Sequence, residues 1–513
     1  MWHTFGYSNG EMVIAAKAWS DFGSHIPLIR SFSLGNNWPP EYPIFSGEPI
    51  RYHFLFYFLV GFLEKLGLRI DYALNIPSAV SFFMLLSSIY LLAKELFKSR
   101  FVATLSVLLF LFNGSFSYLE FFKTHPLSVS TIGDILTSST FPSFGPYDGK
   151  VVSAFWNLNI YTNQRHLALP FSLLIILVFF LLRVRPHTKI SWPLVFLGSI
   201  FLGVLPFAHS SIFVMAVLVL GMGILLFPAL RKTVFLILLL GVFLSIPRIL
   251  FLGQIASFIP SVVIGFLTEP PVSLASFARY WFMNLGLSSL LIPLGFLLSE
   301  KKPRGVLLLF LPLFLVGNLV QFTSEMAGNH KFFNVFLAVG NVFTAFAIYK
   351  IWRVRALGKL IATSLILLVT LSGVIDFFAV KNDSAISIDN YPKSPDISWI
   401  KNNTPEDSVF LNTSYIYNPA SIAGRKIFLG WPYFSWSLGY DTDLRDLEQR
   451  TMLSGRSLHD TCALINKHNI AYVVQTSQKD LETDSEFFEK NFARVYNNPE
   501  TDMTIYSTER CFN

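Results

Sequence analysis

The stretch that decides the fold runs from Trp19 to His53 and reads WSDFGSHIPLIRSFSLGNNWPPEYPIFSGEPIRYH. It combines an aspartate, arginines and histidines with a Pro-rich turn, and a long series of apolar segments follows it. A polar loop that is held against a membrane in this way can collect a charged, lipid-linked substrate. We therefore expect most of the remaining chain to serve as a scaffold for this loop.

The composition is that of a membrane protein. Of the 513 residues, 53% are hydrophobic and 14% are charged, and the mean hydropathy is +0.52; soluble domains contain about 25% charged residues. The net charge of +7 does not indicate nucleic-acid binding, because most of the excess lies in short loops between apolar runs. Two cysteines, Cys462 and Cys511, cannot form a disulfide framework, and no CxxC spacing predicts a zinc site.

Apolar runs cover much of the chain and predict a multi-pass protein of the cell membrane. A helix needs about 20 residues to cross the hydrocarbon layer. We predict ten spans, near residues 73–93, 101–119, 167–182, 190–208, 209–228, 233–247, 279–299, 304–321, 332–350 and 357–379. Basic residues follow every second span, which places those loops in the cytoplasm and the others outside. Two further apolar segments are not counted as spans: 54–63 is interpreted as a helix half-embedded at the outer interface, and 249–266 as an interfacial or re-entrant segment.

The predicted fold class is mainly α, with a polytopic transmembrane helical bundle and a small C-terminal extracytoplasmic α/β domain. We place an extracytoplasmic first loop with interfacial helices at 1–72, the transmembrane helical domain at 73–379, and the soluble extracytoplasmic α/β domain at 380–513. In this last part, helical stretches (396–402, 443–453, 458–468) alternate with β-like runs (408–412, 471–475, 504–507). An outer amino terminus requires a preceding span, so we expect that a first membrane helix is missing ahead of Met1.

Asp21 is the first candidate for chemistry. His25 follows four residues later, and the chain returns through a Pro-Pro turn to Arg51 and His53. An aspartate at a membrane surface can deprotonate a hydroxyl or bind a divalent ion, because burial and nearby cations tune its pKa. The alternative is that Asp21 caps a helix over 22–32, a role that suits its residue type.

Fixed positive charge is the second candidate feature, since a phosphate-bearing group needs it. Three cations lie on the predicted outer face: Arg51, Arg165 in NQRH and Lys331 in GNHKFFN. Arginine binds phosphate oxygens bidentately, and lysine acts as a point charge. For Arg165 and Lys331 the alternative is snorkelling to the membrane interface. We assign substrate binding to these cations and to the neighbouring His166 and His330, together with the two histidines of the first loop.

Other motifs narrow the classes of function. Asp441-Thr442-Asp443 is a DxD, a pattern that elsewhere holds a metal against a nucleotide diphosphate, but Thr442 or Asp443 can equally cap a predicted helix. We therefore assign no metal ligand. The sequence contains no GxxxxGK[ST], HExxH or GxGxxG motif, which argues against ATP-driven transport and zinc peptidase chemistry. The predicted spans contain almost no ionisable residues, which argues against an ion-coupled transporter.

The order of these parts resembles the GT-C glycosyltransferase superfamily. An outer first loop with a key aspartate, then a PP…YP…GPIRYH run and a short apolar helix, is similar to that superfamily. Its members include the protein O-mannosyltransferases, the aminoarabinose transferase and the oligosaccharyltransferase catalytic subunit. NQRH, NHKFFN and the tail GR…LGWPYFSWSLGYDTDLR resemble more closely the bacterial and archaeal polytopic membrane proteins of the DUF2298 (YYY) type. The resemblance covers nearly the whole chain.

The resemblance implies transfer of a sugar from a polyprenyl-phosphate-linked donor to a hydroxyl of a lipid, glycan or protein acceptor on the extracytoplasmic face. Asp21 matches the family's catalytic aspartate by position, and Arg51, Arg165 and Lys331 are placed to hold the lipid phosphate. No second acidic residue stands beside Asp21 for a metal pair, so a divalent cation, Mg²⁺ or Mn²⁺, stays open as the one cofactor. The alternatives are a non-enzymatic polyprenyl-lipid carrier or flippase and an inactive scaffold of the cell envelope.

Overall fold

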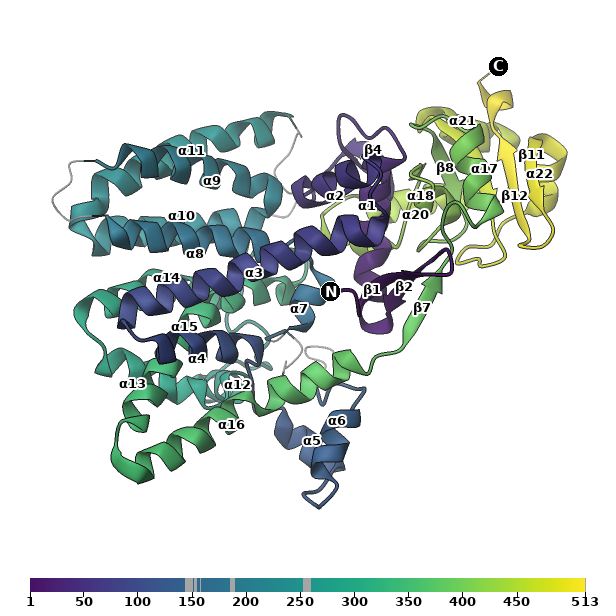
Figure 1. Cartoon of the computed structure of the whole chain (residues 1–513). Coiled ribbons are helices and arrows are strands. Elements are labelled where there is room, and N and C mark those ends of the chain that lie inside the picture. The colour runs from purple at the N-terminus through teal and green to yellow at the C-terminus, as the bar shows by residue number, and fades with distance from the viewer. Residues whose placement is uncertain (144–150, 152–154, 157, 185–189, 252–259, 513) are drawn as a thin grey trace. The chain divides into compact units, whose positions relative to one another are not determined.

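The computed structural model describes the chain except for residues 144–150, 152–154, 157, 185–189, 252–259 and 513 (Figure 1). The chain divides into two compact units. Unit 1 is built mainly from Met1–Pro77 and Ala385–Asn513, and unit 2 from Ser78–Arg248 and Ile259–Ser384. The predicted boundaries near 72 and 380 lie close to the points where the chain passes from one unit to the other. The division into three domains stays a prediction.

Two larger sheets organise unit 1. A three-stranded antiparallel sheet pairs strands that are far apart in the sequence: β1 (Phe5–Ser8), β2 (Glu11–Ala15) and β7 (Ala385–Ile388). A mixed sheet has the order β11-β12-β10-β8-β9, with β8 (Val409–Asn412), β9 (Lys426–Ile427), β10 (Ile470–Gln475), β11 (Ala493–Asn498) and β12 (Met503–Ser507). The three predicted β-like runs lie within one residue of β8, β10 and β12.

Unit 1 also contains helices, two of which lie in the predicted first loop. They are α1 (Trp19–Ser33), α2 (Leu55–Lys65), α17 (Pro395–Asn403), α18 (Pro419–Ile422), α19 (Pro432–Ser437), α20 (Thr442–Leu453), α21 (Leu458–Lys467) and α22 (Ser485–Asn491), with the hairpin β3 (Glu41–Tyr42) and β4 (Phe45–Pro49) between α1 and α2. The three helical stretches predicted in the tail match α17, α20 and α21 to within one residue at each end. α2 lies where the interfacial segment 54–63 was predicted; its place relative to a membrane stays a prediction.

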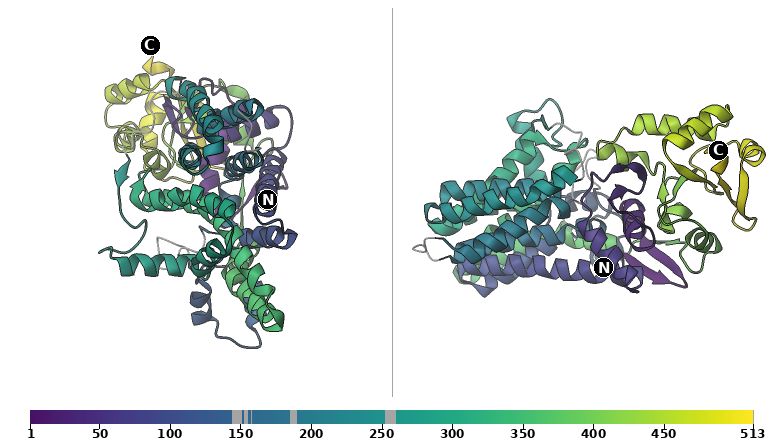
Figure 2. Two further views of the ribbon diagram at one scale, coloured as in Figure 1. Left: turned by 90° about the vertical axis from the view of Figure 1, so that its left-hand side faces the viewer. Right: turned by 90° about the horizontal axis from the view of Figure 1, so that it is seen from above.

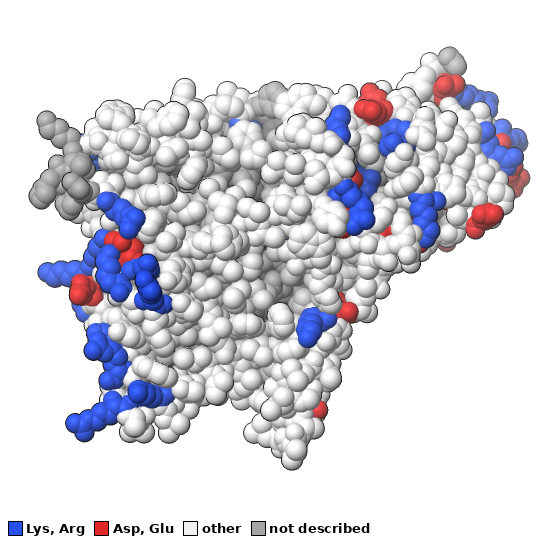
Figure 3. All heavy atoms as spheres, in the orientation of Figure 1, with Lys and Arg blue, Asp and Glu red and all other residues white. Residues whose placement is uncertain are grey.

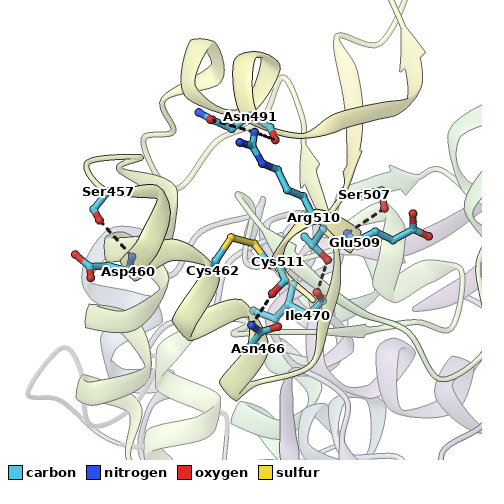
Figure 4. The surroundings of a disulfide bond; sticks show 11 residues. Ser457, Asp460, Cys462, Asn466, Ile470, Asn491, Ser507, Glu509, Arg510 and Cys511 are labelled. Carbon is cyan, nitrogen blue, oxygen red and sulfur yellow. Dashed lines mark hydrogen bonds between the residues drawn. A yellow bond between two sulfur atoms is a disulfide. The ribbon is translucent and has the colours of Figure 1, made fainter. Parts of the chain in front are cut away.

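A disulfide joins Cys462 of α21 to Cys511, and the two Cα atoms are 4.9 Å apart (Figure 4). Asn466, one turn further along α21, donates a hydrogen bond from Nδ2 to the carbonyl oxygen of Cys511 at 2.6 Å. Two cysteines do not make a disulfide framework, as expected from the sequence, but they do form this single bridge, which was not predicted.

Each of the ten predicted spans coincides with an apolar helix or helix pair. These are α3 (Ile70–Phe97), α4 (Arg100–Leu111), α8 (Ala168–Arg183), α9 (Trp192–Ala208), α10 (Ser210–Leu226), α11 (Arg231–Phe251), the pair α12 (Leu274–Leu285) and α13 (Ser288–Leu298), α14 (Lys301–Leu319), α15 (His330–Trp352) and α16 (Arg355–Lys381). Most of these long helices run side by side (Figures 1 and 2). Smaller elements are α5 (Tyr118–Thr124), α6 (Thr131–Thr137), α7 (Asn159–Asn163), β5 (Ser261–Val262) and β6 (Val320–Gln321).

The helix lengths support a membrane protein, while the number of ten spans stays a prediction. Among the described residues, five helices are long and apolar enough to cross a membrane, or six if α12 and α13, which meet at 87°, form one span. α4, α8, α9 and α10 are apolar but shorter. Residues 252–259 of the predicted interfacial or re-entrant segment 249–266 lie outside the described residues, and its placement stays a prediction.

α15 is the central helix of unit 2. Nearly its whole length is buried, against α4, α13, α14 and α16. A helix that is apolar on all sides is typical of the interior of a bundle. Gly295 of α13 permits the closest of these contacts, because a Cβ there would lie 2.2 Å from the carbonyl oxygen of Phe343.

Basic residues gather at one end of unit 2 (Figure 3). Glu95, near the end of α3, forms ion pairs with Lys98 at 2.8 Å, Lys302 at 3.2 Å and Arg183 at 3.7 Å. These cations come from three loops that the charge pattern predicts to be cytoplasmic. The structure therefore places at one end of unit 2 three loops that the predicted topology puts on one side of the membrane.

Candidate functional site

Asp21 lies in the first turn of α1 and does not cap it. The helix begins at Trp19, directly after a 3₁₀ turn over Ala16–Ala18, and its N-cap residue is Ala18. The predicted capping role for Asp21 is therefore wrong, because the chain becomes helical two residues before the aspartate. A carboxylate in the first turn still interacts favourably with the exposed N–H groups of the helix. The Asp21 side chain is half-buried.

Two tyrosines, Tyr52 and Tyr417, lie close enough to Asp21 for its charge to act on their hydroxyl groups. Burial of the hydroxyl raises the pKa of Tyr52 and of Tyr417 above the ordinary value of 10.0, and the negative charge of Asp21 raises both further. Tyr417 also donates a hydrogen bond from its hydroxyl to the carbonyl oxygen of Trp19 at 2.6 Å, which ties its loop to the first turn of α1. Both phenols therefore remain protonated at neutral pH.

The predicted histidines of unit 1 belong to the same aromatic cluster. His25 is buried and stacks on Tyr57, with ring centroids 4.7 Å apart and planes at 28°. His53 is half-buried, and its ring centroid lies 3.7 Å from that of Tyr52. The structure thus brings together Asp21 and two of the histidines that the sequence analysis singled out.

Arg51 is held by contacts within unit 1. Its Nη2 pairs with Glu48 Oε2 at 2.9 Å, and its Nη1 donates to the carbonyl oxygen of Gly439. The guanidinium lies 4.4 Å from the ring centroid of Tyr440. A phosphate that binds Arg51 must therefore compete with the Glu48 carboxylate.

In unit 2, the NQRH motif folds inward. Arg165 is only 1% exposed, and its Nε donates to the carbonyl oxygen of Thr162 at 2.6 Å. A snorkelling arginine keeps its head group in water, so the burial of Arg165 does not fit that alternative. The adjacent His166 is also buried, and it stacks on His209 with centroids 5.4 Å apart and planes at 21°.

The second outer-loop motif opens α15 at His330. Nδ1 of His330 lies 2.7 Å from Oδ1 of Asn334, and its ring contacts Phe155 with centroids 4.9 Å apart. The half-buried Lys331 is close enough for its charge to act on the rings of both His330 and His209. NQRH and NHK, which are far apart in the sequence, therefore converge on His209.

His209 is the residue that sequence reasoning missed. It precedes α10 as its N-cap and is buried at the junction of two apolar helices. A signal was present, because FAHSS places one histidine in an otherwise apolar run. Periodicity cannot tell such a histidine from one that merely packs in the interior, and only the fold shows that its ring meets His166.

The DxD motif has a structural role at its first position. Asp441 is the N-cap of α20, and its Oδ1 accepts a hydrogen bond from the Leu444 amide at 3.3 Å. The prediction that Thr442 or Asp443 caps this helix is wrong, because the helix begins one residue earlier than the pattern indicated. Asp443 is exposed in the first turn.

No family model matches the sequence, and no curated protein matches it significantly. Solved structures do match. The apo oligosaccharyltransferase of Archaeoglobus fulgidus is 11% identical, with a TM-score of 0.51, and the match covers 96% of this chain and 70% of that one. The arabinofuranosyltransferase AftD from Mycobacteria is 12% identical, with a TM-score of 0.57, and the match covers 99% of this chain and 40% of that one.

At these identities the likeness concerns the fold alone. The closer resemblance to the DUF2298 type stays a prediction. The resemblance to the wider superfamily is confirmed at the level of architecture: the chain has the fold of the GT-C membrane glycosyltransferases.

Proposed function

We propose that the protein is a membrane glycosyltransferase that moves a sugar from a polyprenyl-phosphate-linked donor to an acceptor hydroxyl on the extracytoplasmic face. The observation that carries the proposal is the half-buried Asp21 carboxylate in the first turn of α1, within a GT-C fold. A carboxylate beside an acceptor hydroxyl can act as its general base.

The proposed reaction is a direct displacement. Asp21 takes the proton of the acceptor hydroxyl while the hydroxyl oxygen attacks the anomeric carbon of the donor. The bond between that carbon and the phosphate oxygen breaks, and its electron pair leaves with the lipid phosphate. Positive groups that face the departing phosphate lower the barrier, because they stabilise charge that develops in the transition state.

We assign the lipid phosphate to the cations of unit 2. Arg165 supplies a guanidinium, Lys331 supplies an ammonium, and the buried rings of His166, His209 and His330 line the same cluster. Lys331 also lies in the first turn of α15, where the helix N–H groups favour an anion. Arg51 of unit 1 can bind an anion only after it exchanges Glu48 for that anion, and His25 and His53 keep their proposed roles in substrate binding.

The disulfide supports the outer placement of unit 1. Disulfides form and persist in oxidising compartments and are rare in the cytosol, and Cys462 is bonded to Cys511. The predicted topology also puts the residues after 380 outside the cytoplasm. We therefore place the reaction on the extracytoplasmic side of the membrane.

The test is release of radiolabelled sugar from polyprenyl-phosphate hexose and pentose donors by the purified protein, with and without EDTA. We expect turnover with at least one donor, and we expect Asp21→Asn to lower it by a factor of about 10² to 10⁴, the range for loss of a general base. Asp460→Asn is the matched control, because it removes another first-turn carboxylate of unit 1 that is exposed. Loss of turnover in EDTA would assign a divalent cation, Mg²⁺ or Mn²⁺, to Asp21.

Three results would overturn the proposal. Near-normal turnover in purified Asp21→Asn would remove the aspartate from the mechanism. Donor lipid that binds equally well in both forms without any release of sugar would identify a lipid carrier instead, and the absence of lipid binding would identify a scaffold.

A further inference from the structure

Five aromatic residues form a continuous row in unit 1, which we call the aromatic ridge: Trp19, Tyr417, Trp431, Tyr433 and Trp436. Trp19 contacts both Tyr417 and Trp431, with ring centroids 5.9 and 6.3 Å apart. Trp431 contacts Tyr433 at 6.2 Å, and Tyr433 contacts Trp436 at 6.1 Å. The ridge therefore joins the first turn of α1 to the short helix α19.

The outer end of the ridge is partly exposed at the surface of unit 1. Tyr433 is 40% exposed and Trp436 is 45% exposed. They are three residues apart on α19, so they lie on the same side of that helix. Single exposed apolar residues are common, but a row of rings in mutual contact that leads outward is a surface on which a ligand can lie.

The inner end of the ridge reaches the candidate catalytic residue. Trp19 precedes Asp21 by two residues in the same helical turn. Tyr417 bonds through its hydroxyl to the Trp19 carbonyl oxygen, and it feels the charge of Asp21. A ligand that lies along the ridge thus has one end beside the proposed base.

The charges next to the ridge disfavour an anionic membrane surface as its partner. α19 packs against α20, and α20 starts with the exposed carboxylates of Asp441 and Asp443, whereas Asp446, one turn later, is paired with Arg450. Anionic lipid head groups attract clusters of lysine and arginine and are repelled by acids. A neutral ligand with many hydroxyl groups suits both features, because carboxylates accept hydrogen bonds from hydroxyls.

Carbohydrate has the matching chemistry. One face of a sugar ring presents C–H bonds, which pack on the flat, electron-rich face of tryptophan or tyrosine, while the polar edges of these side chains remain able to form hydrogen bonds. We propose that the aromatic ridge binds a carbohydrate chain and that the acceptor of the transfer reaction is therefore a glycan. The succession of four ring contacts favours an oligosaccharide over a single sugar. That the glycan is the acceptor rests on the proposed function, whereas its binding to the aromatic ridge does not.

The test measures glycan binding separately from catalysis. The full-length protein in phosphatidylcholine nanodiscs, which avoids sugar-based detergents, is titrated calorimetrically with neutral oligosaccharides of mannose, galactose or arabinose. We expect at least one of them to bind, and we expect Trp436→Ala to weaken binding about tenfold, since buried aromatic anchors contribute most to such contacts. Trp436→Phe should retain most of the affinity. Trp2→Ala is the matched control, because Trp2 is also 45% exposed in unit 1 and has a ring contact with Tyr72.

Several results would overturn the inference. One is the absence of binding for all three oligosaccharides, and another is equal affinity in the wild type, Trp436→Ala and Tyr433→Ala. Quenching of Trp436 fluorescence by brominated lipid in the nanodisc, measured as the difference from Trp436→Phe, would place the ridge in the membrane instead. Glycan binding without donor turnover would support the glycan-binding role of the aromatic ridge and reject the proposed function. Turnover without glycan binding would support the proposed function and reject the glycan-binding role.

Discussion

Loss of the Cys462–Cys511 disulfide is expected to destabilise unit 1 by about 4 kcal/mol. The bond closes a loop with a sequence separation of 49 residues. In the chain-entropy model, a cross-link over a loop of this length removes about 4 kcal/mol of conformational entropy from the unfolded chain at 25 °C. The Cys511 carbonyl oxygen keeps its hydrogen bond to Asn466 without the bridge, so the folded state changes little and the effect falls mainly on the unfolded state.

Hydrogen exchange measures this effect within unit 1 alone. In the Cys462→Ala, Cys511→Ala double variant, amides of β10 and β12 that exchange through opening of the unit should exchange about a thousandfold faster than in the wild type. Reduction of the wild type should give the same profile, which controls for the substitutions. A change smaller than about tenfold would refute the entropy argument. In intact cells, maleimide should label the wild type only after reduction; labelling without reduction would contradict the outer placement.

Two further predictions concern buried charge in unit 1. Arg425→Met should cost about 3–5 kcal/mol, measured by the same exchange experiment, because it leaves several buried carbonyl oxygens without their donor. Acid should also weaken unit 1. Burial raises the pKa of Glu448, but hydrogen bonds from Lys467 and His468 outweigh burial and bring that pKa below 4.5. Burial lowers the pKa of His468 below 6.5. In both cases the unfolded chain binds more protons than the folded chain, so unit 1 loses stability as the pH falls below 6.5, because of His468, and again as it falls below 4.5, because of Glu448. In a measurement of pH-dependent unfolding, Glu448→Gln should abolish the step at the lower pH.

The local periodicity of apolar residues predicted much of the fold. The apolar runs predicted the long helices, and the alternation of polar and apolar residues placed α20 and β10 to within one residue. β11 was missed, because its sequence, ARVYNN, is largely exposed and shows no alternation of buried and exposed residues. The sheet that pairs β2 with β7 was also missed, since no local signal can reveal a pairing between residues more than 350 positions apart.

The candidate site was also predicted only in part. Asp21 and the NQRH and NHK motifs stood out, because charged residues are conspicuous in an apolar sequence. What the sequence could not give was their surroundings. The pairing of Arg51 with Glu48 depends on a hairpin, and the meeting of His166 with His209 depends on the packing of helices.

Burial and hydrogen-bond partners now separate the arginines that hold the fold from those that are candidates for chemistry. Arg425 is buried and donates to backbone carbonyls and a threonine hydroxyl, so its donors are consumed by the fold. Arg445 is sandwiched between two aromatic rings and bonds to the Ser46 carbonyl oxygen. Arg51 differs, because one of its partners is the partly exposed carboxylate of Glu48, which an incoming phosphate can displace without opening the core. An anion that recruits Arg51 therefore replaces the Glu48 carboxylate, whereas recruiting either of the other two arginines would require unit 1 to unfold locally.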